Sequence, residues 1–117
     1  MADITPQVAT WNGTTNPVMT GAEPDATQTI KKVNPNTTVV ILNNSANPLS
    51  VLLKNQVQDD WSLVVTTQDQ THAIAAGEMK VLSGPFLCEK FRDSDGDVIF
   101  TTSIQTDIAV YAFHRGP

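Results

Sequence analysis

The sequence predicts a single all-β domain, a β-sandwich or jelly roll of about eight short strands with an extended N-terminal arm. The first reason is length, because a chain of 117 residues buries enough surface for one hydrophobic core. The second is composition. Charged residues make up only 16% of the chain, against about 25% in typical globular proteins, and threonine, asparagine, valine and glutamine replace them. The third is spacing, since short apolar or alternating runs recur about every ten residues between turn signals.

From residue 28 onward each run ends in turn-forming residues, for example at 34–36, 76–77 and 84–85. No window shows the sustained apolar spacing that a helix requires. We therefore expect strands at 28–33, 37–42, 49–54, 61–67, 71–75, 78–82, 86–91, 98–103 and 108–113. The side chains expected in the core are Val39, Ile41, Val51, Leu53, Val64, Ile74, Val81, Phe86, Ile99, Ile108 and Val110.

Residues 1–27 form the predicted arm, and residues 28–117 form the predicted sandwich domain. The arm is rich in proline and turn residues, and we do not expect the core to need it. It nevertheless carries Trp11, Val18 and Met19, whose exposure to water is unfavourable. We expect these three side chains to bind a partner, with Trp11 as the main anchor. The alternative is that the arm folds back as an extra edge strand of its own sheet.

The charge balance excludes several partners. Seven basic and twelve acidic residues give a net charge of −5, so we expect neither nucleic acid nor an anionic membrane to bind. The apolar runs at 39–42 and 51–53 are too short to span a bilayer, and the first residues do not resemble a signal peptide. Cys88 is the only cysteine, so we expect no internal disulfide, which fits synthesis in a reducing cytoplasm.

Residues 93–97, which read Asp-Ser-Asp-Gly-Asp, are the densest cluster of possible metal ligands. Their spacing does not fit an EF-hand loop, which has glycine at its sixth position and glutamate at its twelfth. Here glycine is fourth and the twelfth residue is Ile104. Asp95-Gly96 is typical of a type I′ hairpin turn. We expect a tight hairpin without a metal, and a calcium site is the alternative.

The candidate catalytic residues lack partners in the sequence. Cys88 lies in an apolar run and is expected in the core, His72 is expected on an outward strand position, and His114 lies in a terminal tail. No nucleophile motif accompanies them, and one cysteine with two histidines cannot supply a four-ligand zinc site. We therefore expect no enzymatic activity and no cofactor. Trp11 and Trp61 can stack on a sugar, but single tryptophans more often anchor cores or interfaces.

The order of the turn motifs over residues 34–113 is more specific. The chain reads NTTVVILNNS at 36–45, IAAGE at 74–78, SGPF at 83–86 and FRDSDGDV at 91–98, and it ends on a strand at 101–110. This order resembles that of small β-sandwich decoration (cement) proteins of tailed-phage capsids.

The resemblance implies a structural protein made in the host cytoplasm and located on the capsid surface of the virion. It implies binding to the major capsid protein on the outside of the assembled shell, with stabilisation across capsomer junctions and no catalytic residues. Such proteins are often trimers at local three-fold positions, so a homotrimer is favoured among homo-oligomers. The alternative is a carbohydrate- or receptor-binding module of a phage fibre or head, which requires exposed aromatic side chains in a groove.

Overall fold

The computed structural model describes residues 2–9, 24, 26–56 and 69–115, and there the chain is an all-β sandwich with one short helix, α1 (Gly84–Lys90). The larger sheet has five strands in the order β1-β3-β8-β5-β6, and the smaller has four in the order β2-β9-β4-β7. The larger sheet contains β1 (Ala2–Ile4), β3 (Thr27–Ile30), β8 (Val98–Thr102), β5 (Leu49–Leu53) and β6 (Gln70–Ile74). The smaller sheet contains β2 (Gln7–Ala9), β9 (Ile108–Arg115), β4 (Thr37–Asn43) and β7 (Met79–Ser83).

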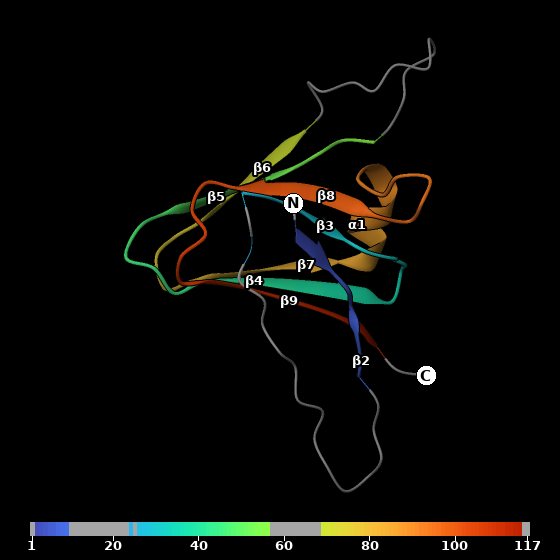
Figure 1. The fold of residues 1–117 in the computed structure, drawn as a ribbon, viewed down its shortest axis with the longest axis horizontal. Helices are drawn as coiled ribbons and strands as arrows, with labels where there is room; N and C mark the ends of the chain where they lie inside the picture. The colour runs from blue at the N-terminus through green and yellow to red at the C-terminus, as the bar shows by residue number, and fades with distance from the viewer. Residues whose placement is uncertain (1, 10–23, 25, 57–68, 116–117) are drawn as a thin grey trace, which may run out of the picture.

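The two sheets face each other, and α1 lies at one end between them (Figure 1). The loops that follow β4, β6 and β8 meet at the opposite end (Figure 1). The backbone N–H of Asn43 donates to Glu78 O, and that of Asn44 donates to Asp107 O, each over 2.9 Å. These bonds join three loops that are distant in the sequence, so one end of the sandwich forms a connected surface of loops.

Strand β4 lies between β9 and β7 in the smaller sheet, and its residues alternate strictly between buried and half-buried positions. Thr37, Val39, Ile41 and Asn43 are buried, and the three residues between them are half-buried. Strand β9 pairs with β4 so that Val39 lies opposite Ala112 and Ile41 opposite Val110. Because side chains of paired residues share a face, the inward rows of both strands form one apolar surface against the larger sheet.

Most of the predicted core is confirmed. Seven of its members are buried: Val39, Ile41, Val51, Leu53, Ile74, Ile108 and Val110. Three others differ: Val81 is 56% exposed, Ile99 is half-buried, and Phe86 packs half-buried against the core from α1. Val81 and Ile99 alternate with the buried Leu82, Val98 and Phe100, so both lie on the outer row of their strands. Val64 and the strand expected at 61–67 lie outside the described residues.

The strand predicted at 86–91 is wrong, because this segment is mostly helical. Ser83 is the extended N-cap residue, Pro85 lies in the first turn, and the N–H of Phe91 donates to Leu87 O over 3.1 Å to close the last turn. Gly84 has a steric role, since a β-carbon there would collide with Asn34 O. Seven residues are too few for a helical period to be read from the sequence. No helix within the described ranges is long and apolar enough to cross a membrane.

The beginning of the chain contributes to both sheets. Strand β1 pairs in parallel with β3, and β2 pairs in parallel with β9. Between them the chain passes from the larger to the smaller sheet (Figure 1). Ile4 is 6% exposed and belongs to the core. The expectation that the core does not need residues 1–27 is therefore wrong for residues 2–9. Three-residue strands show no alternation, so only their pairing partners reveal them.

Candidate functional site

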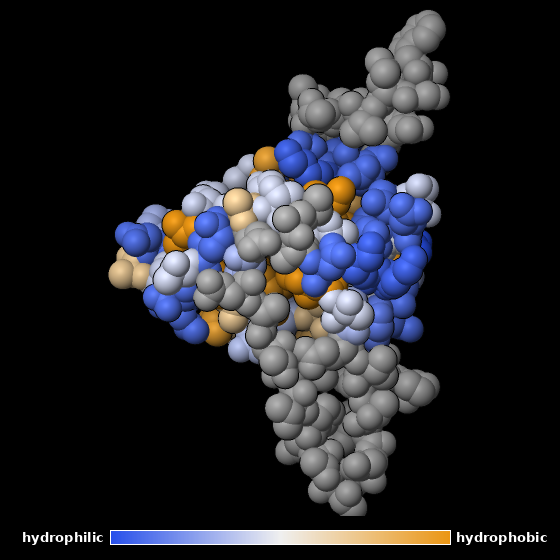
Figure 2. Space-filling model, viewed as in Figure 1, coloured by the Kyte–Doolittle hydropathy of each residue, from blue (hydrophilic) through white to orange (hydrophobic). Residues whose placement is uncertain are grey.

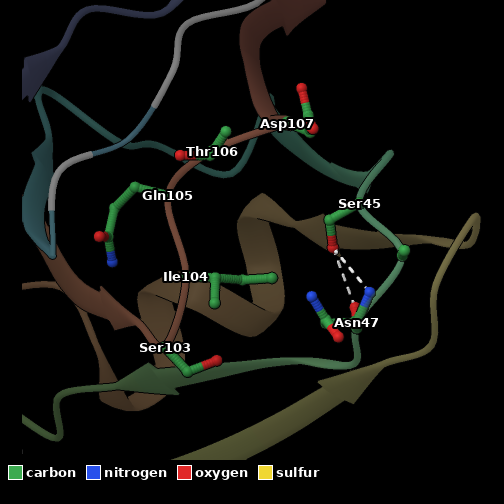
Figure 3. Close-up of a pocket in the computed structure, with 8 residues that line it drawn as sticks. Ser45, Asn47, Ser103, Ile104, Gln105, Thr106 and Asp107 are labelled. Atoms are coloured by element: carbon green, nitrogen blue, oxygen red, sulfur yellow. Dashed lines mark hydrogen bonds between the residues drawn. The ribbon is translucent and has the colours of Figure 1, made fainter.

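Four features of the described chain are candidate functional sites. The first is a pocket at the loop end of the sandwich. Its volume is about 420 Å³ (Figure 3), and its lining consists of Ser45, Ala46, Asn47, Ser103, Ile104, Gln105, Thr106 and Asp107. The side chain of Asn43 binds two of the lining residues, Ser45 and Asn47. Its Nδ2 donates to Asn47 O over 2.8 Å and to Ile74 O over 3.0 Å, and its Oδ1 accepts from Ser45 N over 3.0 Å.

The lining of the pocket is chiefly polar. Hydroxyl and amide groups predominate, Ile104 is its largest apolar side chain, and no aromatic residue is among its described lining residues. Sugar sites commonly stack the sugar ring on an aromatic face. The pocket therefore offers hydrogen bonds without the stacking surface that a carbohydrate module requires. Trp11 and Trp61, the two tryptophans considered for sugar binding, lie outside the described residues.

The second feature is the acidic turn at residues 93–97, whose three carboxylates have ligand atoms within 4.8 Å of one another. Gly96 N–H donates to Asp93 O over 3.1 Å, and Asp93 N–H donates to Asp97 O over 2.9 Å. Gly96 has a φ of 87°, whereas Asp95 is not in the left-handed region. This geometry is a type I turn followed by a left-handed glycine, so the expected type I′ turn is wrong. The chain does reverse direction here, but the first strand of the expected hairpin is replaced by α1, and one isolated bridge between Arg92 and Val98 closes the turn.

Two of the three carboxylates, those of Asp93 and Asp97, already form hydrogen bonds that stabilise the turn. Asp93 Oδ1 accepts the backbone N–H groups of Asp95 and Asp97, each over 2.9 Å. Asp97 Oδ2 accepts from Lys31 Nζ over 2.8 Å, and its Oδ1 accepts from Lys32 N over 3.1 Å. These bonds fasten the turn to the segment after β3. The Lys31 hydrogen bond lowers the pKa of Asp97 and, in return, raises that of Lys31.

The cluster therefore has a structural explanation without a metal. Calorimetric titration with Ca²⁺ is expected to show no binding at submillimolar concentration, and a signal that disappears in Asp95→Ala would contradict this.

The third feature is the outer face of the smaller sheet, which we call the outer apolar face. It is formed by the apolar side chains of β4, β7 and β9 that point away from the core: Val40, Leu42, Met79, Val81, Ala109, Tyr111 and Phe113. The polar Thr38 and Ser83 lie on the same outer row at one end of this face. Met79 and Val81 are 63% and 56% exposed, and they are the exposed large hydrophobic residues of the described chain. The corresponding face of the larger sheet carries mainly threonine and serine. An apolar outer surface of this kind is typical of a protein interface.

On the side of the molecule shown in Figure 2, hydrophilic residues cover most of the surface around α1 and the acidic turn. Hydrophobic residues are gathered nearer its centre, between the two sheets (Figure 2).

The fourth feature is a groove between the edge strands β6 and β7, with a volume of about 290 Å³. Its lining residues are His72, Lys80, Val81, Leu82, Ser83 and Phe86. His72 lies opposite the buried Val51 and therefore points inward, which corrects the expected outward orientation. Its ring meets that of Phe86 edge to face, with centroids 5.9 Å apart, and its Nε2 is buried without a hydrogen-bond partner. Burial, with a smaller effect of Lys80, lowers the pKa of His72.

The described residues do not assemble a catalytic set. Cys88 is half-buried against the core. His114 lies within β9, opposite Thr37, and not in the expected terminal tail. Its Nδ1 shares a hydrogen bond of 2.9 Å with Thr37 Oγ1, but that hydroxyl also accepts the N–H of Asn34 and belongs to a buried residue. His72 faces a phenylalanine and a lysine. We identify no nucleophile with a base and an orienting acid in this part of the chain.

The three predicted partner-binding residues, Trp11, Val18 and Met19, lie outside the described residues. Sequence reasoning missed the outer apolar face and the groove beside it. The alternation over residues 79–82 is a signal for an exposed row in this strand. The expectation that Val81 is in the core places it on the inner row, whereas it lies on the outer row. Comparisons of the chain with protein-family models, with curated proteins and with solved structures find no match.

Proposed function

We propose that this chain is a capsid decoration protein, which binds the outer surface of an assembled phage capsid and stabilises it across capsomer junctions. The observation that carries the proposal is the outer apolar face, on which Met79 and Val81 are more than half exposed. Such side chains favour contact with another protein over contact with water. The ordered turn motifs of residues 34–113 add the resemblance to phage decoration proteins.

The physics of a filled capsid fits this proposal. A shell under pressure from packaged DNA fails first at the junctions between its subunits. A small sandwich that contacts two capsomers adds contacts across such a junction. Because it binds only the assembled form, it stabilises that form by mass action. Repetition over many equivalent sites, and trimerisation through avidity, multiply modest contacts.

The proposed partners are the major capsid protein and sister copies of the chain, with a homotrimer favoured. Trp11, Val18 and Met19 remain the proposed anchors in the N-terminal arm. Because β1 and β2 belong to the sandwich, the arm should be tested by substitution and not by deletion. Changing these three residues to serine should leave the melting temperature within a few degrees of wild type and weaken binding to heads.

The second candidate function is carbohydrate or receptor binding at the loop end. The hydrogen-bonding lining of the pocket favours it, and the lack of an aromatic side chain among the described lining residues counts against it. A glycan array distinguishes it, because decoration requires no glycan signal. An array without signal would exclude carbohydrate binding at this pocket, and substitutions in its lining would then not be needed.

The stabilising function is tested on heads from a phage that lacks the gene for this chain. These heads should release DNA at a lower temperature than complete heads, and added purified protein should raise the release temperature to that of complete heads. Equal release temperatures with and without the protein would contradict the proposal.

A further inference from the structure

The edge strand β7 has the properties of a docking site for another strand. It ends the smaller sheet, and on its outer side no strand of the described chain pairs with it. An edge strand of this kind presents unpaired backbone N–H and C=O groups to its surroundings. Its side chains divide clearly: Met79 and Val81 are exposed on the outer row, whereas Lys80 and Leu82 lie on the inner row opposite Ile41 and Val39.

The groove beside β7 carries one positive charge, that of Lys80, although the chain as a whole is acidic. Its lining contains His72 and Lys80 and no aspartate or glutamate, in a protein whose net charge is −5. Lys80 makes no ion pair within the described part of the chain. The Nε2 atom of His72 is buried without a partner. The remaining lining is mainly apolar, from Val81, Leu82 and Phe86.

We propose that β7 and this groove bind an extended segment of a partner protein as an additional strand of the smaller sheet. The segment carries a carboxylate side chain opposite Lys80, an apolar side chain opposite Leu82, and apolar side chains beside Met79 and Val81. Backbone hydrogen bonds to β7 supply affinity, and the alternating side chains supply specificity. The partner is thus an acidic, alternating peptide segment, whether or not it belongs to a capsid protein.

Charge favours such a partner over a second copy of β7. If the β7 strands of two copies paired around a two-fold axis, both Lys80 ammonium groups would lie on the inner face of the combined sheet. No carboxylate of the groove lining would neutralise them. Like charges on paired strands are destabilising, and an inward lysine on an edge strand opposes self-pairing. A strand with an acidic residue at this position converts the same lysine into an attractive contact.

The inference is tested with two capped peptides, TVLVEVLVT and TVLVKVLVT, added to the full chain. Each carries leucine two positions to either side of its charged residue, so an apolar side chain lies opposite Leu82 whichever way the peptide runs along β7. Backbone amide NMR spectra should show the largest shifts within β7 and at His72. The glutamate peptide should bind about three- to tenfold more tightly than the lysine peptide, because the exchange replaces an attractive cross-strand charge pair by a repulsive one. Lys80→Gln should remove this preference and Lys80→Glu should reverse it. Lys90→Gln, which neutralises an exposed lysine outside the groove lining, should leave it unchanged.

A separate variant, Val81→Lys, tests the apolar half of the proposal. It should weaken both peptides without altering spectral dispersion, because Val81 is exposed. Shifts outside β7, equal affinity for the two peptides, or no binding would overturn the proposal. So would β7 shifts that appear with increasing concentration of the chain alone, or β7 amides already protected from exchange in the free chain. None of these outcomes depends on capsid binding, so failure here is distinct from failure of the proposed function.

Discussion

Replacing Asn43 by alanine is expected to destabilise the fold strongly. The Asn43 side chain is fully buried and makes four hydrogen bonds at the loop end. Two are donated by Nδ2, to Asn47 O and Ile74 O, and two are accepted by Oδ1 from the N–H and hydroxyl of Ser45. Water can replace Asn43 at the exposed partners but not at the buried carbonyl of Ile74.

The expected cost follows from this geometry. A typical hydrogen bond contributes about 1 kcal/mol net, and a buried group left without a partner costs about 1–3 kcal/mol. With partial rehydration of the exposed partners, Asn43→Ala should lower the free energy of unfolding by about 2–4 kcal/mol. For a domain of this size the melting temperature should fall by on the order of 10 °C.

Thermal melts and urea unfolding of three variants measure this effect. Asn44→Ala is the matched control, because Asn44 is exposed and should cost less than about 0.5 kcal/mol. Asn43→Asp keeps the size and the acceptor atoms but loses the two donated bonds, so it should be nearly as destabilising as Asn43→Ala. If Asn43→Ala melts like Asn44→Ala, the loop end is not held together by this side chain and the reasoning is refuted.

Three further predictions concern the core, a buried amide and pH. Ile108→Ala should cost about 2–5 kcal/mol and Val81→Ala less than about 0.5 kcal/mol in urea unfolding; equal costs would contradict the assigned strand rows. Gln28 is fully buried with both amide atoms unpartnered, so Gln28→Met should raise stability by about 1–3 kcal/mol, and a lower melting temperature would count against this. The pKa of Asp97 is lowered by Lys31, so the pair stabilises the fold at neutral pH and this contribution is lost as pH falls through the folded-state pKa of Asp97. Asp97→Asn should therefore be less stable than wild type at pH 7, with the difference shrinking below about pH 4; a difference independent of pH would exclude the ion pair as its cause.

The fold class could be predicted because several strands show an alternation of buried and less buried residues that is visible in the sequence itself. In β4, alternation between buried and half-buried positions is visible in the residues alone, and Val39 and Ile41 were placed correctly. The pattern failed where apolar residues are adjacent. In Val81-Leu82 either residue can be the inward one, and the contact with Val39 selects Leu82.

Other features depend on contacts that no local pattern encodes. Helix α1 contains one short apolar run, Phe86–Cys88, and seven residues are too few to show a helical period. Gly84 fits there because it approaches Asn34. Strands β1 and β2 are three residues long and exist through their pairing with β3 and β9. The groove combines His72 and Lys80 from different sheets, so it emerges only when β6 and β7 are brought together.

Sedimentation of the purified chain with phage heads tests the central claim most directly. The protein is mixed in increasing amounts with intact heads that lack it and, separately, with disassembled major capsid protein. The proposed function predicts saturable co-sedimentation with intact heads, at a fixed number of copies per head, and little association with the disassembled subunits. Binding of the free subunits as tightly as intact heads, or a chain that stays in the supernatant at every concentration, would contradict it.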